Sequence, residues 1–144
     1  MLFDDVKLVV YVCKSRYGRW PIGSAFLNAA RAVAEREGVT GALLDDGKAI
    51  LHVVEGRERA VDRFMAHVAQ DRRLSEIRVI HEARRTTRVF ANTALGYHYD
   101  DAWRPRIAAL IAGGALYRSD VREFCVVLLD GITSRERARE LRQP

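Results

Sequence analysis

Two residues that can exchange protons, Tyr11 and His52, lie in segments whose composition is typical of strands. A phenol hydroxyl can donate a hydrogen bond, and a neutral imidazole carries one donor nitrogen and one acceptor nitrogen. If the two strands are neighbours, a Tyr11–His52 hydrogen bond inside the core is the favoured arrangement. The alternatives are that Tyr11 is the redox partner of a bound ligand, and that His52 contacts this ligand or lies at the surface.

The other chemistry-bearing residues do not cluster in the sequence. Four histidines and two cysteines form no HxH or CxxC spacing, so no metal site is predicted. Cys13 and Cys125 lie in apolar stretches, which favours buried free thiols over a disulfide. The segment 16–19 superficially resembles the phosphate loop of small acyl phosphatases, but it lacks the glycines of an anion-binding loop. With no catalytic triad or carboxylate pair in view, we predict that the chain is not an enzyme.

Charge and hydropathy exclude further classes of protein. The 24 basic and 19 acidic residues give a net charge of +5, and the arginines are interleaved with acids, as in segments 57–59 and 135–137. This pattern predicts a solvated mixed-charge surface and no nucleic-acid partner. No apolar run reaches the ~18 residues that span a membrane, and the acidic Asp4 and Asp5 do not fit a signal peptide. We therefore expect a cytoplasmic protein without a membrane partner.

The elements that must position Tyr11 and His52 follow from hydrophobic periodicity and turn residues. Apolar, β-branched segments predict strands at 6–13, 39–44, 49–54, 77–81 and, more weakly, 87–95. Helical spacing predicts one helix that opens near Pro21 and Ser24 and closes at Gly38, and a second that follows Gly56 and ends near Asp71. The order βαββαβ with an extra strand predicts an α+β, ferredoxin-like fold with both helices on one sheet face.

The remaining sheet face also needs a cover. Alternate residues of the first strand are apolar on both sides, whereas a strand with one wet face should alternate apolar and polar residues. Two amphipathic helices, broken at Gly113 and Gly114, can supply the cover. We thus predict a core over residues 1–99, a helical extension over 100–132 and a charged tail over 133–144.

Six short motifs in this order resemble the BLUF family, the flavin-binding sensors of blue light. They are a strand bearing Val-Tyr, the Gly-Val-Thr-Gly start of the second strand, the Val-Glu-Gly end of the third, Ala60-Val61, Gln70-Asp71-Arg72-Arg73, and Arg88-Val-Phe90. The resemblance covers residues 6–99 by motif and the rest by architecture. It implies a five-stranded mixed sheet, FAD bound between the two helices, and signalling through protein–protein contacts.

The resemblance also implies a role for particular positions. Tyr11 matches the family's redox tyrosine, and His52 falls on the glutamine that bonds both tyrosine and flavin. Val33 and Ala34 fall on an asparagine pair near the end of the first helix, where an asparagine bonds the polar edge of the ring. His67 falls on a basic position near the phosphates, which we interpret as a surface histidine. The family's aspartate is retained as Asp71. Thr93 stands where the family has a tryptophan, and Leu95 stands where it has a methionine.

These substitutions indicate that the scaffold is kept while the flavin chemistry is lost. Each buried polar group of the ring left unpaired costs roughly 1–3 kcal/mol, so two or three losses weaken binding by ~10²-fold or more. We therefore predict a degenerate BLUF domain with weak or absent FAD, acting as a regulatory interaction module and a homodimer. Its contact surfaces are expected to be the apolar sheet face and the C-terminal helical segment. The alternative is a working FAD photoreceptor in which His52 replaces the glutamine.

Overall fold

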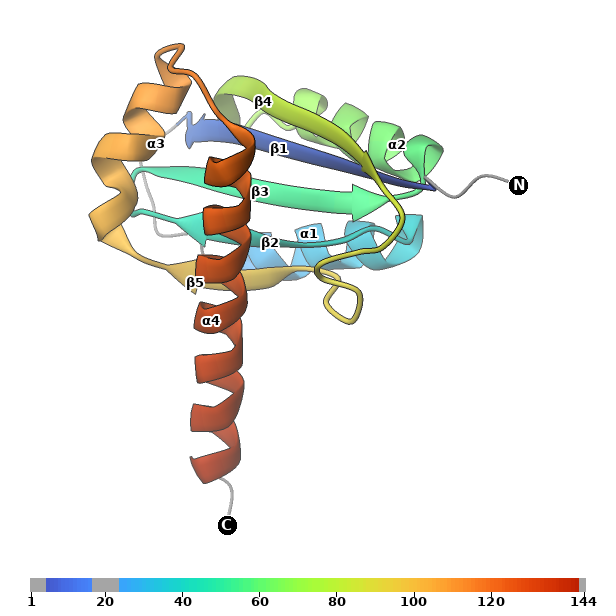
Figure 1. Ribbon diagram of the computed structural model, residues 1–144, viewed down its shortest axis with the longest axis vertical. Helices are drawn as coiled ribbons and strands as arrows, with labels where there is room; N and C mark the ends of the chain where they lie inside the picture. Colours follow the sequence, from blue (N-terminus) through green and yellow to red (C-terminus); the bar gives the residue numbers. More distant parts are fainter. Residues whose placement is uncertain (1–4, 17–23, 143–144) are drawn as a thin grey trace.

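The computed structural model describes residues 5–16 and 24–142, with side chains for 5–16 and 25–132, and its centre is a five-stranded mixed sheet. The strands are β1 (Val6–Ser15), β2 (Thr40–Asp45), β3 (Ala49–Gly56), β4 (Leu74–Arg85) and β5 (Gly96–Tyr99). Their order across the sheet is β4-β1-β3-β2-β5, and every pair is antiparallel except β2 with β5 (Figure 1). The predicted α+β class with a mixed sheet is confirmed.

Turn residues fix the hairpin that carries His52. Asp45 ends β2 and Asp46 follows it, and their carboxylates accept hydrogen bonds from the backbone N–H groups of Gly47, Lys48 and Ala49 at 2.7–2.8 Å. Gly47 has a φ of 92°, a backbone conformation that residues other than glycine rarely adopt. The turn therefore sets the register in which Leu43 of β2 faces His52 of β3.

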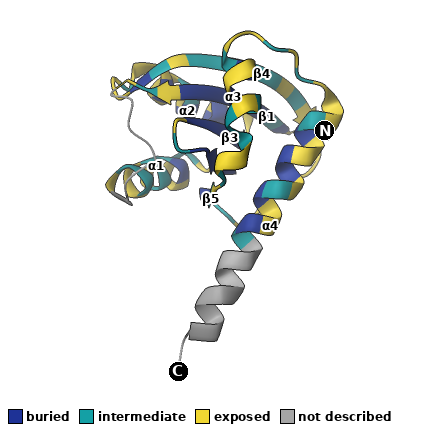
Figure 2. Cartoon of the chain, turned by 90° about the vertical axis from the view of Figure 1, so that its left-hand side faces the viewer, coloured by how far each residue is buried: buried dark blue, intermediate teal, exposed yellow. Residues whose placement is uncertain are grey.

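The two faces of the sheet are covered by different helix pairs. Helices α1 (Ser24–Glu37) and α2 (Glu58–Gln70) pack on one face, against Val9, Tyr11 and Cys13 of β1. Helix α3 (Arg104–Ile111) and helix α4 (Arg118–Arg142) pack on the other, against the alternate residues Leu8, Val10 and Val12. Figure 2 shows the buried side of α4 turned toward the sheet. The predicted cover of the second face is thus confirmed, and that face is buried rather than available as a contact surface.

The predicted strand over 87–95 is wrong. This segment is a series of turns, and the fifth strand begins only at Gly96. The reason is a long-range contact: the buried carboxylate of Glu55 accepts hydrogen bonds from the backbone N–H groups of Val89 and Phe90, both at 2.8 Å. Those two N–H groups are therefore not available to a strand ladder. The fourth strand, in contrast, is longer than predicted and runs from Leu74 to Arg85.

Two C-terminal helices are present as predicted, separated by a break that contains Gly113 with a φ of 109°. The short 3-10 helix η1 (Asp101–Trp103) leads into α3, whose Arg104 donates a hydrogen bond to the carbonyl of Asp46 at 2.6 Å. Helix α4 continues to Arg142, through most of the segment predicted as a charged tail, and extends away from the sheet (Figure 1). Among the described residues, no helix combines the length and apolar character needed to cross a bilayer.

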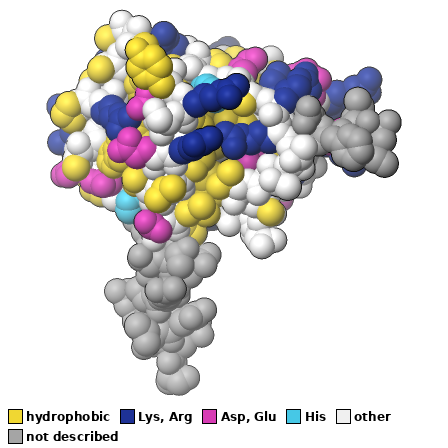
Figure 3. All heavy atoms as spheres, viewed as in Figure 1, with side chains coloured by type: hydrophobic (Ala, Val, Ile, Leu, Met, Phe, Trp, Pro, Cys, Tyr) yellow, Lys and Arg dark blue, Asp and Glu magenta, His cyan; other side chains and the backbone are white. Residues whose placement is uncertain are grey.

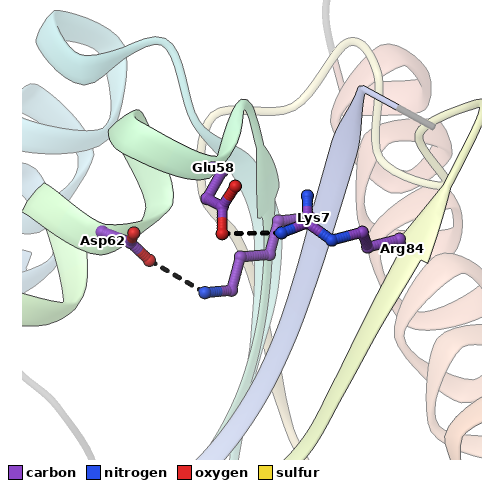
Figure 4. A network of polar contacts seen from close by, with 4 residues as sticks. All are labelled: Lys7, Glu58, Asp62 and Arg84. Carbon is purple, nitrogen blue, oxygen red and sulfur yellow. Dashed lines mark hydrogen bonds and ion pairs between the residues drawn. The ribbon is translucent and has the colours of Figure 1, made fainter. Parts of the chain in front are cut away.

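Ion pairs attach α2 to the edge of the sheet. Lys7 of β1 lies 2.9 Å from Asp62, and Arg84 of β4 lies 2.6 Å from Glu58 (Figure 4). Both acidic residues belong to α2, so the two bridges hold this helix over β1 and β4 on the face that carries Tyr11. The hydrogen bond to Asp62 raises the pKa of Lys7, which therefore stays charged.

Candidate functional site

The structure brings Tyr11 and His52 together as the sequence analysis predicted. They are directly opposite each other in the antiparallel pair β1–β3, so their side chains leave the same face of the sheet. The hydroxyl oxygen of Tyr11 lies 2.8 Å from Nδ1 of His52, and both residues are buried. The ring of Phe64 on α2 stands edge-on to His52, with 5.6 Å between ring centroids. The pair therefore lies between the sheet and α2.

Burial keeps both members of the pair uncharged. Removal from water raises the pKa of Tyr11 well above its usual value, with smaller contributions from Cys13 and Asp71. Burial alone lowers the pKa of His52 to about 3. A neutral imidazole has one protonated nitrogen, so Nδ1 accepts from Tyr11 when the proton is on Nε2 and donates when it is on Nδ1 itself. In either tautomer one nitrogen of His52 is used by Tyr11.

A small cavity of about 70 Å³ adjoins the pair between α1, α2 and the sheet. Apart from Tyr11 and His52, its lining is mainly apolar, and the residues that line it are Phe26, Ala30, Val33, Leu43, Phe64, His67, Val68, Asp71, Arg73, Leu74 and Leu95. Cavities that hold drug-sized ligands usually measure roughly 300–1,000 Å³. The space beside the pair is therefore several times smaller than such sites.

The two α1 positions that the family resemblance singled out lie in different surroundings. Val33 lines the cavity and is partly buried, whereas Ala34 is buried in the core beneath α1 and does not line it. Neither side chain can form a hydrogen bond. Of the two positions, only residue 33 is placed to contact a molecule in the cavity.

Asp71 and His67 line the cavity at the C-terminal end of α2. The carboxylate of Asp71 pairs with Arg73 at 2.8 Å, and the hydrogen bonds from Arg73 lower the pKa of Asp71. The same guanidinium lies 4.5 Å from the centroid of the Phe26 ring. His67 has a side chain that is 51% exposed and lies 3.9 Å from Glu37 of α1, as expected for a surface histidine.

Thr93 and Leu95 belong to the turns before β5 rather than to a strand. The carbonyl of Thr93 accepts a hydrogen bond from the N–H of Gly41 at 2.9 Å, and its side chain does not line the cavity. Leu95 is buried and lines the cavity, and its carbonyl accepts from Arg31 of α1 at 3.0 Å. Sequence reasoning had not identified Arg31, whose contact joins α1 to this turn across 64 residues of sequence.

In the part of the chain that the structure describes, neither a metal site nor a reactive cysteine is found. Within residues 5–16 and 25–132, no three histidine, cysteine, aspartate or glutamate side chains come together as a possible metal site. Cys13 and Cys125 are buried free thiols, as predicted, in the cores on opposite faces of the sheet. Burial raises the pKa of Cys13 to about 12 and that of Cys125 to about 11, so neither is a reactive thiolate.

Comparison with known proteins places this geometry in a family. The family model described as sensors of blue-light using FAD, named BLUF, matches residues 9–96. A search of curated proteins found no match.

Solved BLUF structures share the fold. The BLUF protein BlrB in its dark state has a TM-score of 0.66 at 23% identity, over 86% of this chain and 95% of that chain. BlsA in its ground state also has a TM-score of 0.66, at 17% identity, over 86% of this chain and 87% of that chain. The BLUF domain of BlrP1 has a TM-score of 0.64 at 19% identity, over 88% of this chain and 91% of that chain.

Proposed function

The chain belongs to the BLUF family, the sensors of blue-light using FAD, and we propose that it is a cytoplasmic regulatory member whose flavin site no longer holds FAD. It acts through contacts with protein partners and not by catalysis. The single observation that carries the proposal is the small size of the cavity beside the Tyr11–His52 hydrogen bond, about 70 Å³.

The space beside this bond supports the proposal. A cavity of about 70 Å³ is too small for a three-ring flavin headgroup when ordinary ligand sites need roughly 300–1,000 Å³. Phe64, which is 4% exposed, and Leu43, which is 2% exposed, are part of the close packing that limits it. Making room for a ring system would mean moving side chains out of a core, and core voids and strain both destabilise a protein.

The polar groups that line the cavity do not match the flavin ring either. The ring's carbonyl and amide edge needs several hydrogen-bond partners, and Val33 supplies none. Asp71 is paired with Arg73, and one nitrogen of His52 is paired with Tyr11. Each ring group left unpaired costs roughly 1–3 kcal/mol, so these residues do not fit the ring.

One observation favours the alternative, a photoreceptor in which His52 replaces the glutamine. His52 lines the cavity and keeps a second ring nitrogen that Tyr11 does not use. Because Tyr11 uses one nitrogen of His52, the imidazole has one nitrogen left and can form a hydrogen bond with one atom of the flavin. It cannot both donate to the flavin and accept from it. The degenerate site remains our proposal for this reason.

Absorption spectra of the purified protein test the proposal directly. We expect colourless protein that stays without flavin after incubation with excess FAD and removal of the free cofactor. Yellow protein with flavin absorption bands that shift to the red under blue light would contradict the proposal and support the alternative. A yellow protein whose spectrum does not respond to light would refute the loss of binding but not the loss of the photocycle.

Restoring the missing groups tests the cause. The double variant His52→Gln, Val33→Asn puts amides at two positions that line the cavity, so FAD uptake by this variant would assign the loss of binding to the missing polar groups. The matched control is His52→Gln, Ala29→Asn, because Ala29 is exposed on α1 and does not line the cavity. If both variants stay without flavin, packing rather than missing polar groups excludes FAD. If both bind it equally, residue 33 has no role.

We propose a second copy of the chain as the partner, with α4 as the contact. Val126 is 57% exposed and Leu129 is 38% exposed, and residues three apart lie on the same side of a helix. Light scattering coupled to size-exclusion chromatography should give the mass of a dimer, and Val126→Glu should reduce it to that of a monomer. A monomer in the unmodified protein would rule out this contact.

A further inference from the structure

A second, larger cavity lies at the edge of the opposite sheet face. It measures about 240 Å³ and lies between β4 and the start of α4. We call it the arginine pocket, and the residues that line it are His81, Ala83, Arg84, Arg85, Arg118 and Arg122. In Figure 3, Lys and Arg side chains gather beside a histidine on the face that carries α4.

The positions of these residues follow from the two elements that carry them. His81, Ala83 and Arg85 alternate along β4, so their side chains leave the same face of the strand. Arg118 and Arg122 are four apart on α4, so they lie on one side of that helix. Strand and helix together direct cationic side chains toward one concave space from two sides.

The positive charge of the pocket is not neutralised within the described residues. No acidic residue lines the cavity, and none of the described ion pairs involves Arg85, Arg118 or Arg122. Arg84 differs, because its guanidinium reaches across to Glu58 on α2 (Figure 4). The free charge of the pocket therefore comes from the other three arginines.

Arg85 adds an unsatisfied donor. Its Nε atom is buried, and of the buried side-chain nitrogen and oxygen atoms in the described residues it is the one without a hydrogen-bond partner. Buried donors in folded proteins almost always have a partner, so an orphan donor indicates a missing ligand or water. This donor belongs to a residue that lines the cavity.

The pKa of His81 is lowered by burial and, further, by the charges of its positively charged neighbours Arg85 and Arg118. Like charges held this close repel one another, and they persist in a folded protein at low cost only when an anion or solvent screens them.

From these observations we infer that the arginine pocket is a binding site for a phosphate group, carried by a small metabolite or present as free phosphate. Guanidinium groups bind phosphate oxygens through paired N–H donors, and three of them can surround one dianion. A cavity of about 240 Å³ has room for a phosphate and a small attached group, and it lies on the sheet face opposite the Tyr11–His52 pair. This inference does not depend on the state of the flavin site.

Calorimetric titration of the full chain tests the site with three probes: inorganic phosphate, adenosine monophosphate and adenosine. We expect saturable binding of at least one phosphate-bearing probe, none of adenosine, and weakening as salt rises, because added ions screen the arginines. Tighter binding of the nucleotide assigns the site to phosphorylated metabolites, and tighter binding of inorganic phosphate assigns it to the free ion. Absence of saturable binding by both would overturn the inference.

Arginine variants locate the site. Arg122→Gln and Arg118→Gln should each reduce the affinity about tenfold, since each removes a hydrogen bond to a charged group. Arg122→Lys keeps the charge without the paired donors and should give a smaller loss. The matched control is Arg59→Gln, an exposed arginine on α2 that does not line the pocket, and it should bind like the unmodified protein. Equal losses in Arg59→Gln and Arg122→Gln would refute a specific site.

Discussion

Two cavities lined by described residues lie on opposite faces of one sheet and differ in size and in the state of their polar groups. The cavity beside Tyr11 and His52 measures about 70 Å³, and its polar side chains are largely bonded to one another. The arginine pocket measures about 240 Å³ and contains three arginines that form no ion pair with another described residue. Most polar side chains of the first cavity form hydrogen bonds or ion pairs without a ligand, whereas the arginine pocket contains a buried donor without a partner among the described residues.

Under our two proposals, the scaffold has lost the ligand site on one face of its sheet and carries a different one on the opposite face. In the first cavity, Tyr11 is bonded to one nitrogen of His52 and Asp71 is bonded to Arg73, so a ligand could bond these groups only in competition with internal hydrogen bonds. In the arginine pocket, a bound anion would relieve repulsion and satisfy a buried donor. The free energy of folding should therefore respond in opposite ways when polar groups are removed from the two sites.

The largest expected effect is at the satisfied site. Tyr11→Phe leaves Nδ1 of His52 buried without its partner and should lower the free energy of unfolding by about 1–3 kcal/mol. Urea denaturation monitored by circular dichroism measures the change. Tyr117→Phe is the matched control, because Tyr117 is 68% exposed, and it should stay within about 0.5 kcal/mol of the unmodified protein.

A double variant sharpens this prediction. Adding His52→Leu to Tyr11→Phe removes both polar partners, so the pair of changes should cost less than the sum of the two single changes. Additive losses would mean that the two side chains do not stabilise each other. The first cavity would then not contain a pair of polar groups that satisfy each other.

A smaller effect is expected from pH. The folded protein keeps His52 neutral with a pKa of about 3, whereas an unfolded chain has a histidine pKa near 6.5. The unfolded state therefore binds the proton first, and stability falls as the pH drops below 6.5. Between pH 6.5 and 5.5 the loss should be about 1 kcal/mol, and His81, whose pKa is also lowered, acts in the same direction.

His52→Gln removes this titration and should flatten the pH dependence in the same window. The acidic residues with lowered pKa values, among them Asp71, protonate at lower pH and do not interfere. An unchanged slope in His52→Gln would show that His52 is accessible to protons in the folded state.

The smallest effect is expected at the unsatisfied site. Arg122→Gln breaks no ion pair of the described residues and reduces the repulsion around the arginine pocket. Without added anions, thermal unfolding should show a change within about 0.5 kcal/mol, in the stabilising direction. A decrease of more than about 1 kcal/mol in the free energy of unfolding would mean that Arg122 stabilises the fold. The arginine pocket would then resemble the first cavity in this respect.

The sequence predicted much of the first site because its geometry depends on local pattern and neighbouring strands. The first and third strands are neighbours in the predicted fold, and this was sufficient to place Tyr11 beside His52. The cover of the second sheet face was also predictable, since β1 is apolar on both sides.

What the sequence could not predict depends on contacts between distant residues. Segment 87–95 has a strand-like composition, but the distant carboxylate of Glu55 binds the backbone N–H groups of Val89 and Phe90 within it. The arginine pocket joins β4 to a helix that starts at Arg118, and in the sequence its arginines look like an ordinary mixed-charge surface. Val33 and Ala34 are adjacent in the sequence, and only the structure shows which of them lines the cavity.

The strand order also has a consequence for how the chain folds. The first strand to be synthesised, β1, lies between β3 and β4, so it cannot complete its pairing until residues 74–85 have left the ribosome. Its partner contacts span long stretches of sequence, as in the 41-residue separation of Tyr11 and His52. Loops of that length close at an entropic cost that slows folding. Formation of the Tyr11–His52 bond therefore marks the moment at which the centre of the sheet is assembled.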